Sequence, residues 1–183
     1  MVKPEVAFIS GPIDTGPGAE YFKSHYVAPI DAAIARDHRF VIGPIPSGVD
    51  ADALDYLLAY PVDPLRITIF VTETEDRIAG DGFRARGVNV QVVGDRTTLP
   101  RERDAAMTAA STYDILRIRT EKEARKLYGR AYRSGHMTNT EYNWKRRKGS
   151  PTREAPDGRE ETSPSRATRK NGWLRRLSAK LPK

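Results

Sequence analysis

The sequence predicts a doubly wound α/β fold with a mainly parallel, five-stranded sheet between two layers of helices. Two observations lead to this prediction: five short apolar runs recur along the chain, and helical patterns separate them. The runs are residues 6–10, 39–43, 66–72, 88–93 and 113–118. The first three are almost continuously apolar, which is typical of strands buried on both faces of a parallel sheet. The fourth run alternates more, so we expect it near an edge.

Helical patterns fill most of the intervals between these runs. In residues 19–36 apolar side chains recur at three- and four-residue steps, and Pro29 is expected to kink this helix or to start a second one. Further helices are predicted over 100–111, where a proline stands in the first turn, and over 121–132. Residues 74–87 are rich in Asp, Gly and Arg, and we expect a loop with about one helical turn.

Charge divides the chain into a folded domain and a basic tail. Residues 1–143 carry 18 Lys and Arg against 20 Asp and Glu, whereas residues 144–183 carry 13 against 4. We therefore expect one Rossmann-like domain over 1–148, a disordered basic linker over 149–171 and a short amphipathic basic helix over 172–183. The high isoelectric point belongs to the tail.

Composition excludes several classes of protein. The chain has no cysteine, which rules out disulfides and thiolate metal sites, and its three histidines show no metal-ligand spacing. We therefore predict neither a metal nor a cofactor. No signal-peptide pattern stands at the N-terminus, and no apolar segment approaches the roughly 18–20 residues that span a bilayer. We expect a cytoplasmic protein.

Two glycine-rich turns follow neighbouring predicted strands. Residues 10–18 come after the first strand, and residues 43–50 come after the second. In a doubly wound sheet, ligands bind outside the carboxyl ends of the strands, where backbone N–H groups of such turns can approach a phosphate. Within the two turns, the predicted ligand-binding residues are Ser10, Gly11, Asp14, Gly43, Ser47 and Gly48.

These turns and several later residues resemble the SLOG superfamily, which contains the Lonely Guy phosphoribohydrolases and the DNA-processing protein A domain. The pattern is also similar to the nucleoside 2-deoxyribosyltransferase-like proteins. The matching residues are Ile9–Gly11 with Asp14, Tyr21, Phe22, His25, Tyr26, Ile30 and Asp31, then Gly43, Ser47–Asp50 and Ala53, then 103–111 and 113–116, and finally 138–141 with Asn143, Arg146 and Arg147. The resemblance covers roughly residues 6–147.

The resemblance implies binding of a nucleotide or nucleoside phosphate, and several members of these groups cleave or transfer at an N-glycosidic bond. Two departures from the family pattern stand in this sequence. It lacks the Pro-Gly-Gly-x-Gly-Thr-x-x-Glu signature of the Lonely Guy enzymes, and residues 137–143 replace an expected Ser-Gly-Thr-x-x-Asn element with Met-Thr-Asn-Thr-Glu-Tyr-Asn. The second departure favours a binding role over catalysis.

Breaking an N-glycosidic bond develops positive charge on the sugar, so a carboxylate beside the anomeric carbon is needed. The candidates are Asp104 and, close behind it, Asp50. Asp50 also suits the N-cap of the next helix, and Asp14 suits an Asx-turn before Gly16. Asp104 leads because Arg103 beside it could hold a phosphate.

Met107 and Ser111 lie further along the same predicted helix and are expected to face the ligand with Arg103. Together with Asp104 they would form one side of the binding site.

Two further hypotheses remain open at this stage. The chain could be a non-catalytic nucleotide-sensing module that signals through its basic tail, or, less favoured, a nucleic-acid-binding protein. The tail itself could bind a protein partner, nucleic acid or an anionic membrane surface. Alternatively, the tail only increases solubility and has no binding partner. The sequence does not decide between a monomer and a homo-oligomer.

Overall fold

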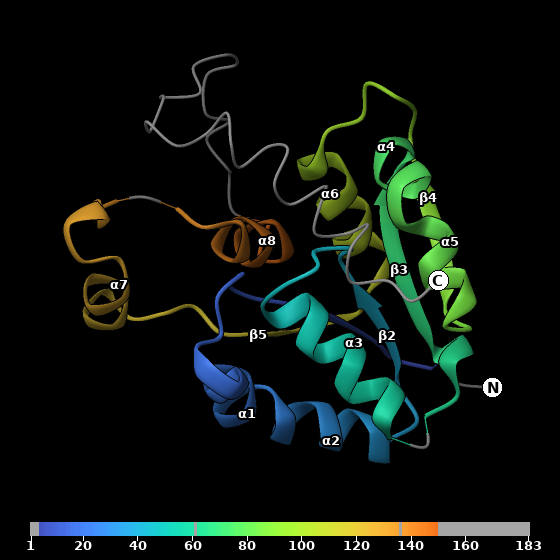
Figure 1. The fold of residues 1–183 in the computed structure, drawn as a ribbon, viewed down its shortest axis with the longest axis horizontal. Coiled ribbons are helices and arrows are strands. Elements are labelled where there is room, and N and C mark those ends of the chain that lie inside the picture. The colour runs from blue at the N-terminus through green and yellow to red at the C-terminus, as the bar shows by residue number, and fades with distance from the viewer. Residues whose placement is uncertain (1–3, 61, 136, 150–183) are drawn as a thin grey trace.

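The computed structural model describes residues 4–60, 62–135 and 137–149. A five-stranded, all-parallel sheet forms its centre, with strands in the order β4-β3-β2-β1-β5 (Figure 1). The strands are β1 (Val6–Ser10), β2 (Arg39–Ile42), β3 (Ile67–Thr72), β4 (Asn89–Val93) and β5 (Tyr113–Leu116). All five predicted strands are confirmed, and so is the α/β fold class. The predicted linker from Ser150 onward and the predicted terminal helix lie outside the described residues.

The order in which strands are added to the sheet reverses once, beside β1. From β1 the chain adds β2, β3 and β4 to one side, and then returns to place β5 on the other side of β1. Ser10 at the end of β1 pairs in register with Leu116 at the end of β5. In doubly wound sheets, the crevice at such a reversal is the usual place for a ligand.

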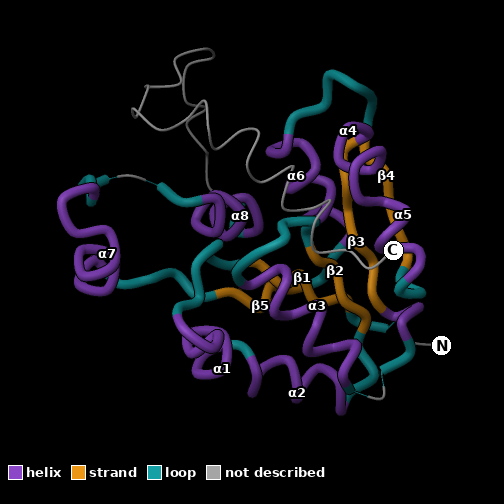
Figure 2. Tube along the Cα trace, in the orientation of Figure 1, coloured by secondary structure: helices purple, strands orange, loops and turns teal. Residues whose placement is uncertain are grey.

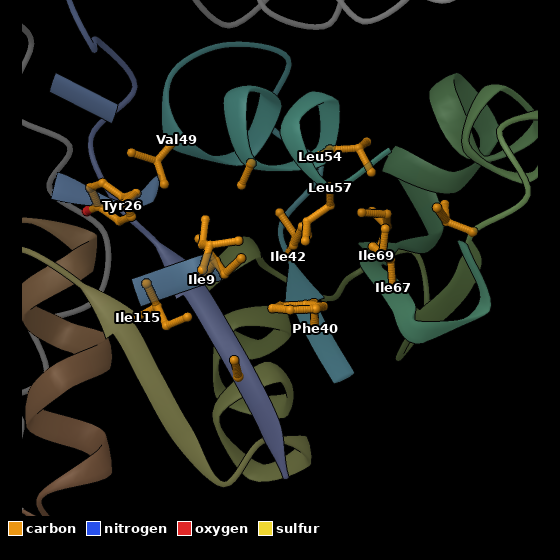
Figure 3. Close-up of a cluster of buried hydrophobic side chains, with 14 of the residues drawn as sticks. Ile9, Tyr26, Phe40, Ile42, Val49, Leu54, Leu57, Ile67, Ile69 and Ile115 are labelled. Atoms are coloured by element: carbon orange, nitrogen blue, oxygen red, sulfur yellow. The ribbon is translucent and has the colours of Figure 1, made fainter. Parts of the chain in front are cut away.

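Alternation along the strands supplies two separate cores, since successive side chains point to opposite faces of a sheet. Ala7 and Ile9 contribute to the larger core, which lies beneath the helices of one face, whereas Phe8 joins Met107 in a smaller core on the other face. Figure 3 shows the larger core, with Leu54 and Leu57 directed toward the isoleucines of the strands. Burial on both faces explains why the first three strands read as continuous apolar runs.

Helices cover both faces of the sheet. On the side of the larger core are α1 (Glu20–His25), α2 (Val27–Ala35), α3 (Val49–Ala59) and α5 (Asp81–Ala85), and on the side of the smaller core are α6 (Pro100–Ala110) and α8 (Asn139–Arg147). Figure 2 shows α7 (Glu121–Tyr128) set apart from the sheet and joined to it by loops. Short 3-10 turns are η1 (Pro17–Ala19), η2 (Pro64–Arg66) and η4 (Gly129–Ala131). Within the described part of the chain, no helix has the length and apolarity to cross a bilayer.

The segment predicted as a loop, residues 74–87, is helical over most of its length, so that prediction was wrong. It consists of α4 (Glu73–Glu75), a π-helical turn η3 (Asp76–Gly80) and α5. Thr72 and Glu75 form a reciprocal capping box at its start. Farther along, Arg84 pairs with Asp76 at 2.7 Å, and Phe83 is buried in the larger core. Ion pairing along the segment therefore accounts for charges that suggested a loop.

Two predicted helix boundaries also shift. The helical region 19–36 divides at Tyr26 rather than at Pro29, which stands in the first turn of α2, where its missing N–H is tolerated. The helix predicted over 121–132 ends at Tyr128, before Gly129. Residues 137–143 were expected as a degraded binding element, and from Asn139 onward they belong to α8, which starts behind a Thr138–Glu141 capping box.

Candidate functional site

The two predicted turns do follow β1 and β2, and they contact each other. The backbone N–H of Val49, the first residue of α3, donates to the Pro12 carbonyl at 3.0 Å. Gly48 precedes that helix with φ of 70°, and a Cβ there would overlap the Pro12 carbonyl oxygen. Only glycine suits this position, because it needs both a positive φ and space for a close backbone approach.

Asp50 is not the N-cap of α3, which corrects the structural role predicted for it. Gly48 occupies the cap, and Asp50 is the second helical residue. Its carboxyl group lies against the backbone of Gly43, so closely that a Cβ on Gly43 would overlap Oδ2. The side chain therefore reaches across the end of β2 instead of closing its own helix.

The surroundings of Asp50 raise the pKa of its carboxyl group to about 7. Burial is the largest cause, since a buried carboxylate loses its hydration. Arg103 opposes this shift by charge attraction and the Ile45 backbone N–H opposes it by hydrogen bonding, whereas the carboxylates of Asp104 and Glu75 add to it. A carboxyl group with a pKa near neutrality can give and take a proton at physiological pH.

Ser10 brings an unsatisfied hydroxyl to the end of β1. The residue is 6% exposed, and its Oγ has no hydrogen-bond partner among the described residues. Strand alternation directs Ser10 to the same face as Phe8, toward α6. A buried polar group without a partner is unusual and costs stability, so a ligand atom could supply the missing bond.

Arg103 is held by protein carboxylates on both sides. Its Nη1 donates to Glu75 Oε1 at 2.5 Å, and its Nε and Nη2 donate to Asp104 Oδ1 at 3.1 and 2.9 Å. Arg103 and Glu75 are both buried, at 4% and 3% exposure. Glu75 also accepts the Thr72 backbone N–H at 2.8 Å as part of the capping box. The guanidinium is therefore committed to an internal ion cluster, which does not match the expectation that it binds a ligand phosphate.

Several predicted residues lie away from this centre. Ser111 stands just past the far end of α6, where its hydroxyl donates to the Met107 carbonyl and accepts from Arg147 Nη2. Met107 is 1% exposed within the smaller core, although its terminal methyl comes close to Gly43. The prediction that both face the ligand beside Arg103 is wrong for Ser111, because helix and strands run antiparallel and α6 ends at the opposite edge of the sheet.

Other predicted residues have identifiable local roles. Asp14 Oδ1 accepts the Gly16 N–H at 2.9 Å, so the Asx-turn is confirmed. A Cβ on Gly11 would overlap the Tyr26 hydroxyl and the Val49 side chain. Ser47 is partly buried in the turn between β2 and α3.

Sequence reasoning missed two sets of residues at the strand ends. Glu75 was hidden in a segment predicted as a loop, although the Thr72-x-x-Glu75 spacing of a capping box was a usable signal. Tyr21, Arg117 and Arg119 form a second polar group beyond β1 and β5, in which Arg117 Nη1 donates to the Tyr21 hydroxyl at 2.8 Å. Their separation of 96 residues leaves no local pattern to find.

In the described part of the chain, no three His, Asp or Glu side chains are arranged to hold a metal ion. The groups at the strand ends can transfer a proton, through Asp50, and form hydrogen bonds, through Ser10 and the turn backbones. Comparisons with protein-family models, with curated proteins and with solved structures find no match for this chain.

Proposed function

We propose that this chain binds a nucleotide or nucleoside phosphate at the carboxyl ends of β1 and β2 and cleaves or transfers at its N-glycosidic bond. The observation that carries the proposal is the position of Asp50, whose carboxyl group is buried against Gly43 with a pKa near 7. The resemblance of the two turns to SLOG and deoxyribosyltransferase-like proteins supplies the ligand class. The reversal of strand order beside β1 supports the location.

In this proposal Asp50 acts as the acid and then as the base. Protonated Asp50 gives its proton to the leaving nitrogen of the nucleobase as the bond between that nitrogen and the anomeric carbon breaks. The resulting carboxylate stabilises the positive charge on the sugar and takes the proton that an attacking water, or a second hydroxyl in a transfer reaction, loses as it adds to the anomeric carbon. Asp50 thus returns to its starting form.

The proposal places Asp50 ahead of Asp104, which reverses the order expected from sequence. Asp104 Oδ1 accepts two hydrogen bonds from Arg103, and this bonding favours a role in holding the ion cluster together. Through its charge Asp104 also contributes to the raised pKa of Asp50. We therefore assign Asp104 to positioning and tuning rather than to proton transfer.

The test is release of free base from a panel of nucleosides and nucleoside monophosphates, followed by chromatography. The full chain is compared with Asp50→Asn, which keeps the size of the side chain, and with Asp104→Asn. We expect Asp50→Asn to bind ligand and to release base at least about a hundredfold more slowly, as is typical when a general acid–base group is removed.

Release of base by Asp50→Asn at the parental rate would refute the assignment of Asp50. Ligand binding by the parent without release from any panel member would instead support the non-catalytic sensing module. Thermal melting of each variant without ligand checks that it is folded.

A further inference from the structure

A second polar cluster lies where the chain leaves β5. It comprises Arg117 and Arg119, which follow the strand, and Tyr21 from α1. The guanidinium carbon of Arg119 lies 4.3 Å from the centre of the Tyr21 ring, and that of Arg117 lies 5.3 Å from it. One tyrosine ring is thus contacted by two cations, a geometry that holds both guanidinium groups in place.

This cluster is joined to the turn after β1. Arg119 Nη2 donates to the Asp14 carbonyl at 2.6 Å. The Arg117 backbone N–H donates to the Tyr26 hydroxyl at 3.1 Å, and that hydroxyl donates to the Ser10 carbonyl at 3.1 Å. The two arginines therefore stand at the carboxyl ends of β1 and β5, where the strand order reverses.

The charge of Arg119 is not balanced by a carboxylate. Arg117 pairs with Glu123 at 2.7 Å, but in residues 4–60, 62–135 and 137–149 Arg119 has no ion pair, and its hydrogen bond goes to a carbonyl oxygen. A guanidinium has five N–H donors, so most of those on Arg119 remain for a ligand. Arg103 differs in this respect, since each of its three guanidinium nitrogens donates to a carboxylate of Glu75 or Asp104.

His25 lies beside Tyr21, and the charges of the cluster affect the pKa of its ring. Its ring meets the edge of Tyr21 at 4.7 Å, and its pKa is lowered, first by burial and then by the charges of Arg117 and Arg119, against an opposing effect of Glu123. The two guanidinium groups stand here against the single carboxylate of Glu123, and this balance of charge favours an anion.

We propose that Arg119, with Arg117 beside it, binds the phosphate group of a nucleoside monophosphate at the carboxyl ends of β1 and β5. The proposal deepens the proposed function and rests on it for the nucleoside part of the ligand, while the phosphate part can be tested alone. An arginine fork suits phosphate because it can donate two parallel hydrogen bonds. In this arrangement Arg119 takes the role that the sequence suggested for Arg103.

The test is calorimetric titration of the full chain with inorganic phosphate, a nucleoside and its monophosphate. The variant is Arg119→Gln. Arg125→Gln is the matched control, because Arg125 also lies over a tyrosine ring, at 5.0 Å from Tyr132, but pairs with Glu121 at 2.7 Å. We expect Arg119→Gln to weaken phosphate and monophosphate binding by roughly ten- to a hundredfold, the effect of losing a charged hydrogen bond, and to leave nucleoside binding unchanged. Arg125→Gln should change none of the three affinities.

Equal monophosphate affinity in Arg119→Gln and the parent would overturn the proposal, and so would equal losses for nucleoside and monophosphate. No measurable binding of phosphate or monophosphate by the parent would overturn it too. Arg119→Lys, which keeps the charge but not the fork, should lose less affinity than Arg119→Gln, and melting of each variant without ligand shows whether the fold is intact.

The two proposals fail separately. If Arg119→Gln loses phosphate binding while no panel member is cleaved, the phosphate site stands and the glycosidic activity does not. If base release depends on Asp50 and monophosphate affinity does not depend on Arg119, the activity stands and the phosphate site is overturned.

Discussion

Replacing Arg103 with methionine should destabilise the protein far more than removing an exposed arginine. Arg103→Met keeps an unbranched, flexible stem but removes the guanidinium group, which leaves the carboxylates of Glu75 and Asp104 without their cation. Arg103 is 4% exposed, so its ion pair with Glu75 is buried. Breaking a buried pair by removing one partner costs about 3–5 kcal/mol, because a charge remains in a poorly solvated place.

The matched control is Arg96→Met. Arg96 Nε lies 2.9 Å from Glu73 Oε1, but its side chain is 74% exposed, and exposed pairs contribute less than about 1 kcal/mol. Urea denaturation followed by circular dichroism gives the free energy of unfolding of the parent and both variants by linear extrapolation. Loss of Arg103 also removes the charge that lowers the pKa of Asp50, which should then rise above 7.

Acidification supplies a second, independent readout for Arg103→Met. Because the pKa of Asp50 should rise above about 7 without Arg103, the folded variant gains more than the parent from binding that proton, so the difference in unfolding free energy from the parent should shrink between pH 7.5 and pH 5. A loss no larger than that of Arg96→Met, or a loss that does not change with pH, would refute the reasoning.

Two further predictions concern Asp50 and the turn before it. The folded-state pKa of Asp50, about 7, lies above its ordinary value of 3.8, so the folded state binds a proton that the unfolded state has lost. The free energy of unfolding should therefore fall as pH rises from about 4 to 7, by at most about 1.4 kcal/mol per pH unit. Urea titrations should show a flatter slope in Asp50→Asn, and an unchanged slope would contradict the raised pKa. Gly48→Ala should cost about 1–3 kcal/mol, since its Cβ would overlap Pro12 at a φ of 70°. Gly129→Ala, at a φ of 51° with open space around the new Cβ, is the control and should lose less; equal losses would show that the contact with Pro12 does not matter.

The strand and helix pattern was readable from sequence because burial imposes it locally. A strand covered on both faces must be apolar at every position, so 6–10, 39–43 and 66–72 stood out. The alternation of 88–93 predicted its edge position correctly, since β4 is the last strand of the sheet. Both glycine-rich turns were also placed correctly at strand ends, because the strand-to-helix order determines which turns lie at the carboxyl edge.

Predictions failed where an interaction between distant residues replaced a local preference. Residues 74–87 were expected as a loop because of their polarity, but Phe83 is buried in the larger core and Arg84 is paired. Asp50 was expected as a helix cap, a role that Gly48 fills because its backbone meets Pro12.

The sequence alone determined the fold class, the five strands and the edge at which the turns gather, since these depend on periodicity and on chain order. Tertiary structure decided which arginine side chains at that edge pair with a carboxylate. Arg103 pairs with the carboxylate of Glu75, 28 residues away in sequence. Arg119 donates to the carbonyl oxygen of Asp14, 105 residues away, and has no carboxylate partner among the described residues. The sequence shows two arginines of equal charge, and only the partners that folding brings to each one distinguish an internal ion pair from a site for an anion.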